Sequence, residues 1–378
     1  MFHNETTSST SDLQSSDDCD EVATWSILPA GTSTYRDLPR AAEAAFDLPL
    51  DSDLIYILSR GSNLAGSVAI RDDGATGANV VKVNVRIYYT APDILKMCKL
   101  CLLQSERGKN GVGIFTPPRS IPAGYRMFFD VRISLPSAPQ SSYVRINSLE
   151  THLPNFRHEV GNLSKTIDFG SISLQSSNQP IIVHSLLAQR LNMKTSNGAI
   201  QGIFTSLSAD LRSSNGPILA DVKLLNGGDG ASTLDLQTSN GEITAKVSLV
   251  SQAQHATGGI FRVAAKTSNG ELDVSFPTAP HNSVLHLDTQ TSNAPSTVSL
   301  HKTFEGEFRL QTSPRKAMVF YDQSATDPTG NRRTRSVNYV QDRRGGVSGN
   351  AVWTPRVGAQ TLGSIVMKTS NADLQLVL

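Results

Sequence analysis

One short phrase recurs along the second half of the chain and constrains the fold more than any other feature. It reads LNMKTSNGAIQG at 191–202, LDLQTSNGEITA at 234–245 and VAAKTSNGELDV at 263–274. The aligned copies share an asparagine, at Asn178, Asn197, Asn215, Asn240, Asn269, Asn293 and Asn371, and Pro314 takes the asparagine place in a further copy. Self-similarity at a period of about 20 residues is typical of solenoids, in which each coil packs on the next.

Polar and apolar residues alternate around each asparagine. The position four residues before it is mostly Leu or Met, and the position three residues before it is always Lys, Arg or Gln. A period of two predicts strands with one buried face. We therefore predict an all-β fold, a parallel β-solenoid or β-helix with right-handed coils. An antiparallel meander of hairpins is the competing interpretation, because the shortest unit, 18 residues, also has room for a second strand.

An Asn–Gly pair stands in four of the copies, at 197–198, 215–216, 240–241 and 269–270. This pair tolerates positive φ better than others, so we expect a tight corner between successive strands. Stacked coils would place each asparagine about 4.8 Å above the last. The side-chain amides could then hydrogen-bond from coil to coil, as in the asparagine ladders of cross-β packing.

The chain divides into three predicted parts. Residues 1–24 are polar and acidic and are predicted to be a disordered tail. Residues 50–142 are predicted to form an N-terminal β region that caps the first coil, because an open coil end is an unpaired sheet edge. Residues 143–378 carry the repeats, with an insert at 321–361 that is expected to form a hairpin turning at Gly345–Gly346. Either this insert covers the last coil, or the open end pairs with another copy.

Composition and charge limit which cellular compartment and which cofactors we expect. The net charge is +1, which gives no global field for nucleic acid or membrane. We find no signal peptide and no apolar run long enough to span a membrane, and we expect a cytoplasmic protein. Three cysteines, Cys19, Cys98 and Cys101, do not make a disulfide framework. Cys98 and Cys101 should face opposite sides of a strand, and one such pair is weak evidence for zinc. We expect no cofactor and no metal.

Two sets of charged residues are candidates for a site. Asp210, Asp235 and Asp288 share the position five residues before the asparagine, and stacking would bring Asp210 beside Asp235. Solvated carboxylates near Arg212 are favoured over a catalytic pair or a calcium site. The second set is a dense basic cluster in the insert: Arg332, Arg333, Arg335, Arg343 and Arg344. It is interpreted as a solvated loop, with a docking patch for an acidic partner as the alternative.

The repeats, the segment YVRINSLETHLPNF (143–156) and the segment GVGIFTP (111–117) resemble a large family of uncharacterised fungal proteins, a domain-of-unknown-function family abundant in mushroom-forming fungi. The resemblance covers about residues 50–378. The repeat is also similar to bacterial adhesin-type domains that form right-handed β-solenoids. Neither resemblance implies a catalytic residue. The second implies a role at a surface.

Three functional hypotheses follow. The first is a non-enzymatic scaffold or binding module for an unknown protein or glycan partner, favoured because the outer polar column is uniform. The second is a carbohydrate-active β-helix enzyme, which needs clustered carboxylates or aromatic side chains, whereas aromatic residues make up 6% of the chain. The third is an adhesin that reaches the cell surface by an unconventional route. Sequence-specific binding of nucleic acid is not expected.

Overall fold

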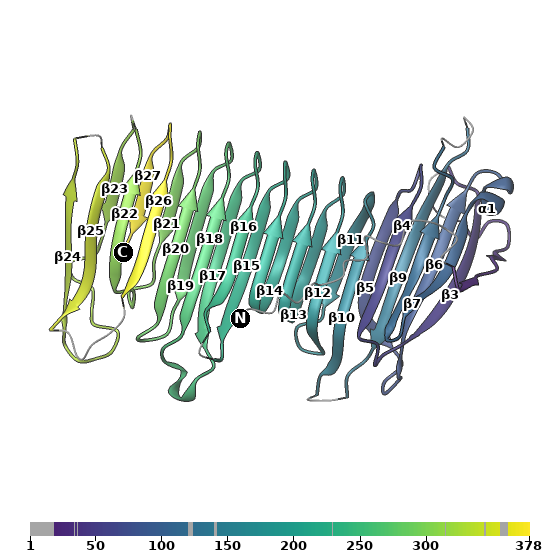
Figure 1. Cartoon of the computed structure of the whole chain (residues 1–378), viewed down its shortest axis with the longest axis horizontal. Helices are drawn as coiled ribbons and strands as arrows, with labels where there is room; N and C mark the ends of the chain where they lie inside the picture. The colour runs from purple at the N-terminus through teal and green to yellow at the C-terminus, as the bar shows by residue number, and fades with distance from the viewer. Residues whose placement is uncertain are drawn as a thin grey trace.

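The computed structural model describes residues 19–378 apart from 34, 36, 120–123, 140–141, 229, 314, 344 and 356–361. These described residues form 27 strands and two short helical elements, α1 (Asp93–Met97) and η3 (Gln254–Ala256). The all-β prediction is therefore confirmed. The molecule is an elongated rod whose strands run across its long axis (Figure 1). Most of the predicted tail, together with Pro314 and Arg344, lies outside the described residues.

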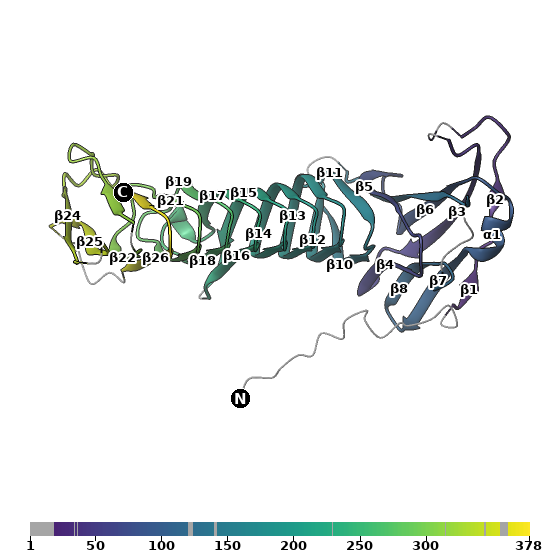
Figure 2. The ribbon, with the colours of Figure 1, turned by 90° about the horizontal axis from the view of Figure 1, so that it is seen from above.

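The strands form two facing layers, which the asparagine corners connect (Figure 2). The first sheet holds the strands that precede the corners. From the N-terminal end these are β1 (Glu21–Val22), β7 (Lys99–Glu106), β8 (Lys109–Phe115), β4 (Leu54–Arg60), β10 (Val144–His152), β12 (Ile167–Gln175), β13 (Ile181–Lys194), β14 (Ile200–Arg212), β16 (Ser232–Gln237), β18 (Ile260–Lys266), β20 (Val284–Gln290), β26 (Gly363–Lys368), β22 (Gly306–Gln311), β25 (Val347–Thr354) and β24 (Thr334–Gln341).

The second sheet holds the strands that follow the corners. In the same direction these are β2 (Ser26–Ile27), β3 (Arg40–Pro49), β6 (Val80–Tyr89), β9 (Met127–Pro136), β5 (Gly66–Gly74), β11 (Phe156–Asn162), the first halves of β13 and β14, β15 (Ile218–Asn226), β17 (Ile243–Ser251), β19 (Leu272–Thr278), β21 (Ser296–Ser299), β27 (Leu374–Val377) and β23 (Ala317–Phe320).

Successive coils stack in parallel and in register. β14 pairs with β16, β16 with β18 and β18 with β20, and the second sheet repeats this order from β15 to β21. A hairpin meander would pair neighbouring strands antiparallel, so that alternative is wrong for the repeats. The inward side chains of the two sheets form one continuous apolar core from Ala42 to Leu376. No single coil could bury its apolar face alone, and the stack is therefore the cooperative unit.

The N-terminal region joins this stack through parallel pairs. β4 pairs with β10 and β5 pairs with β11, so residues 54–74 form a first coil level. Beyond it the pairing becomes antiparallel, between β3, β6 and β9 in one layer and between β7 and β8 in the other. The two-residue strands β2 and β1 lie on the outermost edges. Strand β1 falls inside the segment 1–24 that was predicted to be a disordered tail.

The C-terminal coil does not lie where the chain order would put it. β26 is hydrogen-bonded to β20 on one side and to β22 on the other, and β27 lies between β21 and β23. The coil 363–377 is thus inserted between the coils 284–299 and 306–320, which Figure 1 shows as yellow strands among green ones. The end coil is 306–320, and β25 pairs antiparallel with its strand β22. In the described pairings, β24 pairs with β25 alone.

The coil 284–299 carries polar residues where its neighbours are apolar. Thr289 occupies the inward column that runs through Leu236, Ala265 and Met367. Both Thr289 and Ser296 are fully buried, and neither hydroxyl has a hydrogen-bond partner. An unpaired buried hydroxyl costs about 1–3 kcal/mol. This coil is therefore the least stable level of the repeat stack.

The helices of the described chain include none that is long and apolar enough to span a membrane.

Two substitutions in the inward column that contains Thr289 test the cost of an unpaired buried hydroxyl. Thr151 occupies the same column at its first level, and its hydroxyl is 2.8 Å from Nε2 of His158. Burial lowers the pKa of His158 to about 4, so the ring is neutral and this nitrogen accepts the bond. We expect Thr289→Val to raise the free energy of unfolding by about 1–2 kcal/mol, and Thr151→Val to lower it by about 1–3 kcal/mol. Urea titrations followed by circular dichroism measure both; changes of the same sign would contradict this account.

Candidate functional site

The predicted asparagines form a continuous ladder on the exposed corner of the rod. The amide Nδ2 of each donates to Oδ1 of the asparagine in the preceding coil, over 2.6–2.7 Å. The ladder begins at Asn155, which accepts from Asn178. It passes from Asn293 directly to Asn371, 78 residues further along the chain. The ladder therefore follows the spatial order of the coils and not the sequence order.

The rest of the phrase is explained by the inner side of the same corner. The residue two before each asparagine is a buried Ser or Thr. In Thr238, for example, the hydroxyl donates to the carbonyl of Gly216 in the preceding coil and accepts the N–H of Gly241. At the four Asn–Gly corners the hydroxyl thus satisfies a backbone group within its own corner and one in the corner below. Thr–Ser–Asn–Gly is a structural corner.

The glycine of the phrase serves a different purpose from the one predicted. None of the four repeat Asn–Gly pairs is among the positive-φ residues of the described chain. A Cβ on Gly216, Gly241 or Gly270 would instead overlap the carbonyl oxygen of the glycine in the preceding coil. The glycines are needed because backbones of successive coils approach too closely for a side chain. Ala294 takes this place in the coil 284–299, and there the hydroxyl of Thr291 has no partner.

The structure separates the described arginines of the predicted docking patch. Arg333 is 9% exposed and lies at the base of the hairpin, whereas Arg343 lies at its turn, beyond the eight residues of β24. Arg332 is exposed and has a φ of 59°. Arg344 lies outside the described residues. The sequence places these arginines close together along the chain, but a hairpin sends them to opposite ends.

Arg333 and Arg335 hold the hairpin against the end coil. Arg333 pairs with Asp327 at 3.1 Å and with Glu305 at 3.0 Å, and these three side chains are at most 12% exposed. Hydrogen bonding from Arg333 keeps the pKa of Asp327 well below its ordinary value. The guanidinium of Arg335 lies 5.2 Å from the ring of Trp353, and burial lowers its pKa to about 10. Both arginines are structural anchors.

The aspartate column is bound by basic side chains. Asp210 and Asp235 are register partners, and Arg212 bridges them, with Nε 2.6 Å from Asp210 and Nη2 3.0 Å from Asp235. Asp288 pairs with Lys266 at 3.3 Å. The predicted solvated carboxylates near Arg212 are what the structure contains. Within the described ranges, no three His, Cys, Asp or Glu side chains group together as a metal site would require.

The cysteines correct one expectation. Cys19 and Cys101 form a disulfide, which joins the segment before β1 to β7. The sequence did not indicate this pairing, because Cys19 lies within residues 1–24, whose composition predicts a disordered tail. Cys98 is a buried free thiol packed in the main core, whereas Cys101 belongs to a separate cluster. The two side chains therefore enter different clusters, but only Cys101 lies in a strand, because Cys98 is the C-terminal cap of α1 and β7 begins at Lys99.

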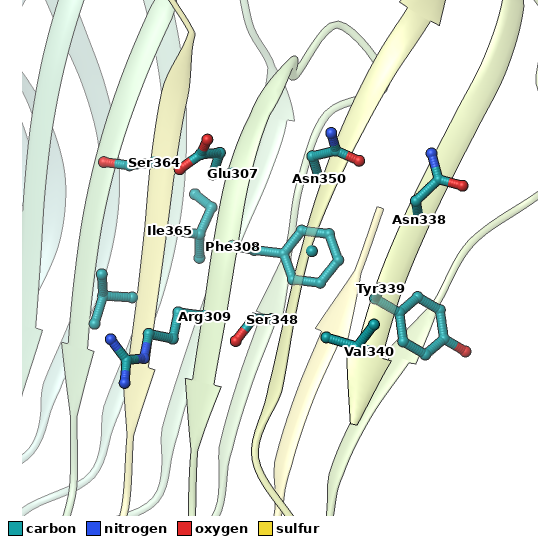
Figure 3. A pocket seen from close by; sticks show the side chains of 12 residues that line it. Glu307, Phe308, Arg309, Asn338, Tyr339, Val340, Ser348, Asn350, Ser364 and Ile365 are labelled. Atoms are coloured by element: carbon teal, nitrogen blue, oxygen red, sulfur yellow. The ribbon is translucent and has the colours of Figure 1, made fainter. Parts of the chain in front are cut away.

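A trough crosses the first sheet near its C-terminal end (Figure 3). We call it the C-terminal trough; its volume is about 720 Å³. One wall is formed by Ser364, Glu307, Asn350 and Asn338, which are register partners on β26, β22, β25 and β24. The other wall is formed in the same way by Val366, Arg309, Ser348 and Val340. The floor is the backbone between the two walls, so the trough runs along the rod and across the strands.

One wall of the trough is polar along its length, whereas the other also carries Val366 and Val340. Glu307, Asn350 and Asn338 are exposed, and they line up across three adjacent strands as Figure 3 shows. His286 continues this row on β20, with its Nδ1 2.8 Å from Oγ of Ser364. Arg309 supplies a positive charge on the opposite wall. The trough therefore offers both donors and acceptors at the strand spacing of about 4.8 Å.

A second trough of about 620 Å³ lies on the second sheet and also crosses successive coils. Its walls include Gln201, Thr244 and Asp273 on one side and His184, Asp221 and Lys246 on the other. The exposed Ile203, 52% accessible, lies within it. Both troughs arise because outward side chains of stacked parallel strands form rows along the rod.

Sequence reasoning missed the C-terminal trough for a definite reason. Its walls combine residues 307–309, 338–340, 348–350 and 364–366, and their adjacency depends on the inserted coil. The alternation of polar residues in VSGNAVW (347–353) and RSVNYVQ (335–341) was a local signal that these strands have a solvent-facing side. It did not reveal which strands are neighbours.

Comparison with known proteins gives a family-model match to part of the chain and a general likeness to solved structures. A model described as a domain of unknown function (DUF7330) matches residues 191–325, within the repeats. No curated protein matches the sequence. Similar solved structures include three bacterial proteins, each described as a "putative" cell adhesion protein or adhesin.

The protein from Clostridium sporogenes is 7% identical, with 89% of this chain and 99% of that chain covered and a TM-score of 0.19. The one from Parabacteroides merdae is 12% identical, with 69% and 96% covered and a TM-score of 0.32. The one from Bacteroides fragilis is 9% identical, with 89% and 96% covered and a TM-score of 0.30. At these values the likeness carries no argument about the site.

The corner can be tested with one glycine and a matched control. A Cβ at position 241 would overlap the carbonyl oxygen of Gly216, whereas a Cβ at position 228 meets no atom within 4 Å. We expect Gly241→Ala to lower the free energy of unfolding by about 1–3 kcal/mol, because the coils must separate locally. Gly228→Ala should leave it within about 0.5 kcal/mol. Equal stability of the two variants in urea titrations would refute the close-approach explanation.

The cysteine arrangement predicts a count of reactive thiols. Burial raises the pKa of Cys98 to about 12, so the folded protein should resist alkylation at neutral pH. Denaturation without a reductant should expose one thiol, and denaturation with a reductant should expose all three. Mass spectrometry after iodoacetamide treatment gives the number. Three alkylated cysteines in denatured, unreduced protein would show that Cys19 and Cys101 are not bonded.

Proposed function

We propose that the protein is a non-catalytic binding module, a rigid β-rod whose C-terminal trough holds an extended polar polymer, of which a glycan chain is the first candidate. One observation carries this proposal: the trough runs along the rod, and one of its walls repeats a hydrogen-bonding group on each of four adjacent strands. Such a surface suits a ligand that is itself a linear repeat. A compact small molecule would be better held by an enclosed pocket.

The rigidity of the rod supports this role. The asparagine ladder and the buried hydroxyls tie each coil to the one below, so outward side chains keep fixed spacings over many coils. Side chains held in position lose less entropy when they bind a ligand. In the same proposal the coils form a right-handed solenoid and the N-terminal β region is its cap. The short strands β1 and β2 on the outermost edges support the cap.

The chemistry of the trough favours binding over catalysis. Glu307 is the one carboxylate among the twelve residues that line it, whereas glycoside hydrolysis ordinarily uses a pair. Asp210 and Asp235 lie elsewhere on the first sheet, and Arg212 holds both. A carbohydrate-active enzyme remains the alternative function. It predicts that soluble sugar products accumulate when the protein is incubated with a polysaccharide.

The location of the module is also a proposal. The sequence-based expectation was the cytoplasm, with the cell surface as the alternative. The Cys19–Cys101 disulfide supports the surface, because disulfides persist mainly in oxidising compartments.

Binding can be tested on an array of immobilised plant, fungal and bacterial polysaccharides. We expect the full chain to bind a subset of them, and the double variant Asn338→Ala with Asn350→Ala to bind at least about 10-fold more weakly, since it loses two hydrogen-bonding side chains. A control variant, Gln201→Ala with Thr244→Ala, alters the second trough and should bind as the wild type does.

Circular dichroism checks that both variants are folded. The proposal fails if no polysaccharide binds, or if the trough variant binds as tightly as the wild type. Release of reducing sugars by the wild-type protein would favour the enzyme alternative.

A further inference from the structure

The inserted C-terminal coil separates two coils that are consecutive in the sequence. Coils 284–299 and 306–320 are joined by residues 300–305, and each carries its own copy of the repeat. Yet β20 and β22 do not pair with each other, because β26 lies between them and is hydrogen-bonded to both. The space between these two coils is therefore a slot that is completed only by the last coil of the chain. We call it the coil slot.

The C-terminal coil occupies the coil slot through the same kinds of contact that join other coils of the rod. Asn371 donates to Asn293 as each asparagine does to the one below, and Ile365, Met367, Leu374 and Leu376 are at most 1% exposed. The pairing is parallel and in register on both sides. Nothing in these contacts depends on the occupant belonging to the same molecule.

One wall of the coil slot, the coil 284–299, holds several buried hydroxyls without a partner. Of the unpaired buried side-chain atoms in the described chain, three belong to this coil, on Thr289, Thr291 and Ser296. Ala294 on this wall and Ala372 on the inserted coil both stand where four other corners have glycine. The backbone hydrogen bonds to the inserted coil are present, but the side-chain contacts that strengthen other levels are reduced here. Local opening of a protein starts where such contacts are fewest.

The connection before the inserted coil has eight residues, 355–362, between β25 and β26. Eight residues can span up to about 28 Å. Gly306 of β22 is the register partner of Ala351 on one side and of Gly363 on the other, so β25 and β26 are about 10 Å apart. The number of residues in the connection therefore exceeds what the separation of the two strands requires, as exchange of the coil would need.

We propose that the C-terminal coil, residues 363–377, is an exchangeable element and that the coil slot binds the same coil of a second copy of this chain. Exchange of an identical element creates no contact that the monomer lacks, so it is a low-cost route to a dimer. The exchanged coil brings its own Ser364 and Val366, which form part of both walls of the C-terminal trough. Each trough in the dimer is then built from two copies.

Cysteine cross-linking distinguishes exchange from a fixed coil. Position 288 on β20 is the register partner of position 366 on β26, and both lie on the solvent face. One full-length copy carries Asp288→Cys, and a second copy with a longer tag carries Val366→Cys. The copies are mixed, incubated for increasing times and oxidised in a glutathione buffer. Non-reducing gel electrophoresis then separates the product that links the two copies.

The control replaces Asp288→Cys with Asp235→Cys. Position 235 lies in the same column of the first sheet, but position 264 separates it from position 288 and it never pairs with position 366. We expect the 288–366 product to accumulate with time and to exceed the 235–366 product at least about 10-fold. Circular dichroism of each single variant shows that it is folded before mixing.

A third measurement ties the exchange to the coil 284–299. Adding Thr289→Val to the copy that carries Asp288→Cys should slow formation of the product about five-fold, because it removes a buried hydroxyl that lacks a partner. The proposal is overturned if the mixed copies give no more product than the 235–366 control, while a single chain carrying both Asp288→Cys and Val366→Cys forms its internal cross-link completely. That result would show a coil that stays fixed in its own rod.

Discussion

The close approach of successive backbones at the asparagine corner governs the rest of this structure. Glycine permits the approach, a buried Thr or Ser hydroxyl bonds the backbone of two successive coils, and the asparagine amide continues the ladder outside. These contacts fix the coil spacing at the corner, and the parallel pairs of both sheets continue it along the strands. The spacing in turn lines up outward side chains into the rows that border the troughs.

The coil 284–299 shows what happens when the constraint is relaxed. It lacks the corner glycine, and two of its inward positions hold Thr289 and Ser296 instead of larger apolar residues. Its neighbour in the rod is the C-terminal coil and not the coil that follows in the chain. The C-terminal trough begins on the next strand, β26, and none of its lining residues belongs to the coil 284–299.

Charged side chains illustrate how far local sequence can mislead about function. The sequence favoured a solvated loop for the arginine cluster of the insert, with a docking patch as the alternative, but Arg333 is buried between two carboxylates and Arg335 lies beside Trp353. Their partners, Asp327, Glu305 and Trp353, come from three separate segments of the chain. A cluster of like charge in the sequence is compatible with a surface or with buried ion pairs, and only the positions of the partners decide between them.

The sequence by itself determined the repeat, the all-β class and the inward and outward faces of the repeat strands, because a period of two and a recurring corner depend on neighbouring residues alone. It favoured a parallel stack over a hairpin meander, and the strand pairing of the structure decided between them. The sequence also identified the asparagines of the ladder, since each corner repeats the same local geometry. Only the tertiary structure decided that Asn371 follows Asn293, that Cys19 reaches Cys101 and that four strands share the C-terminal trough. All coils present similar edges, so local pattern alone could not specify which edges meet; the choice depends on connections and packing across the whole rod.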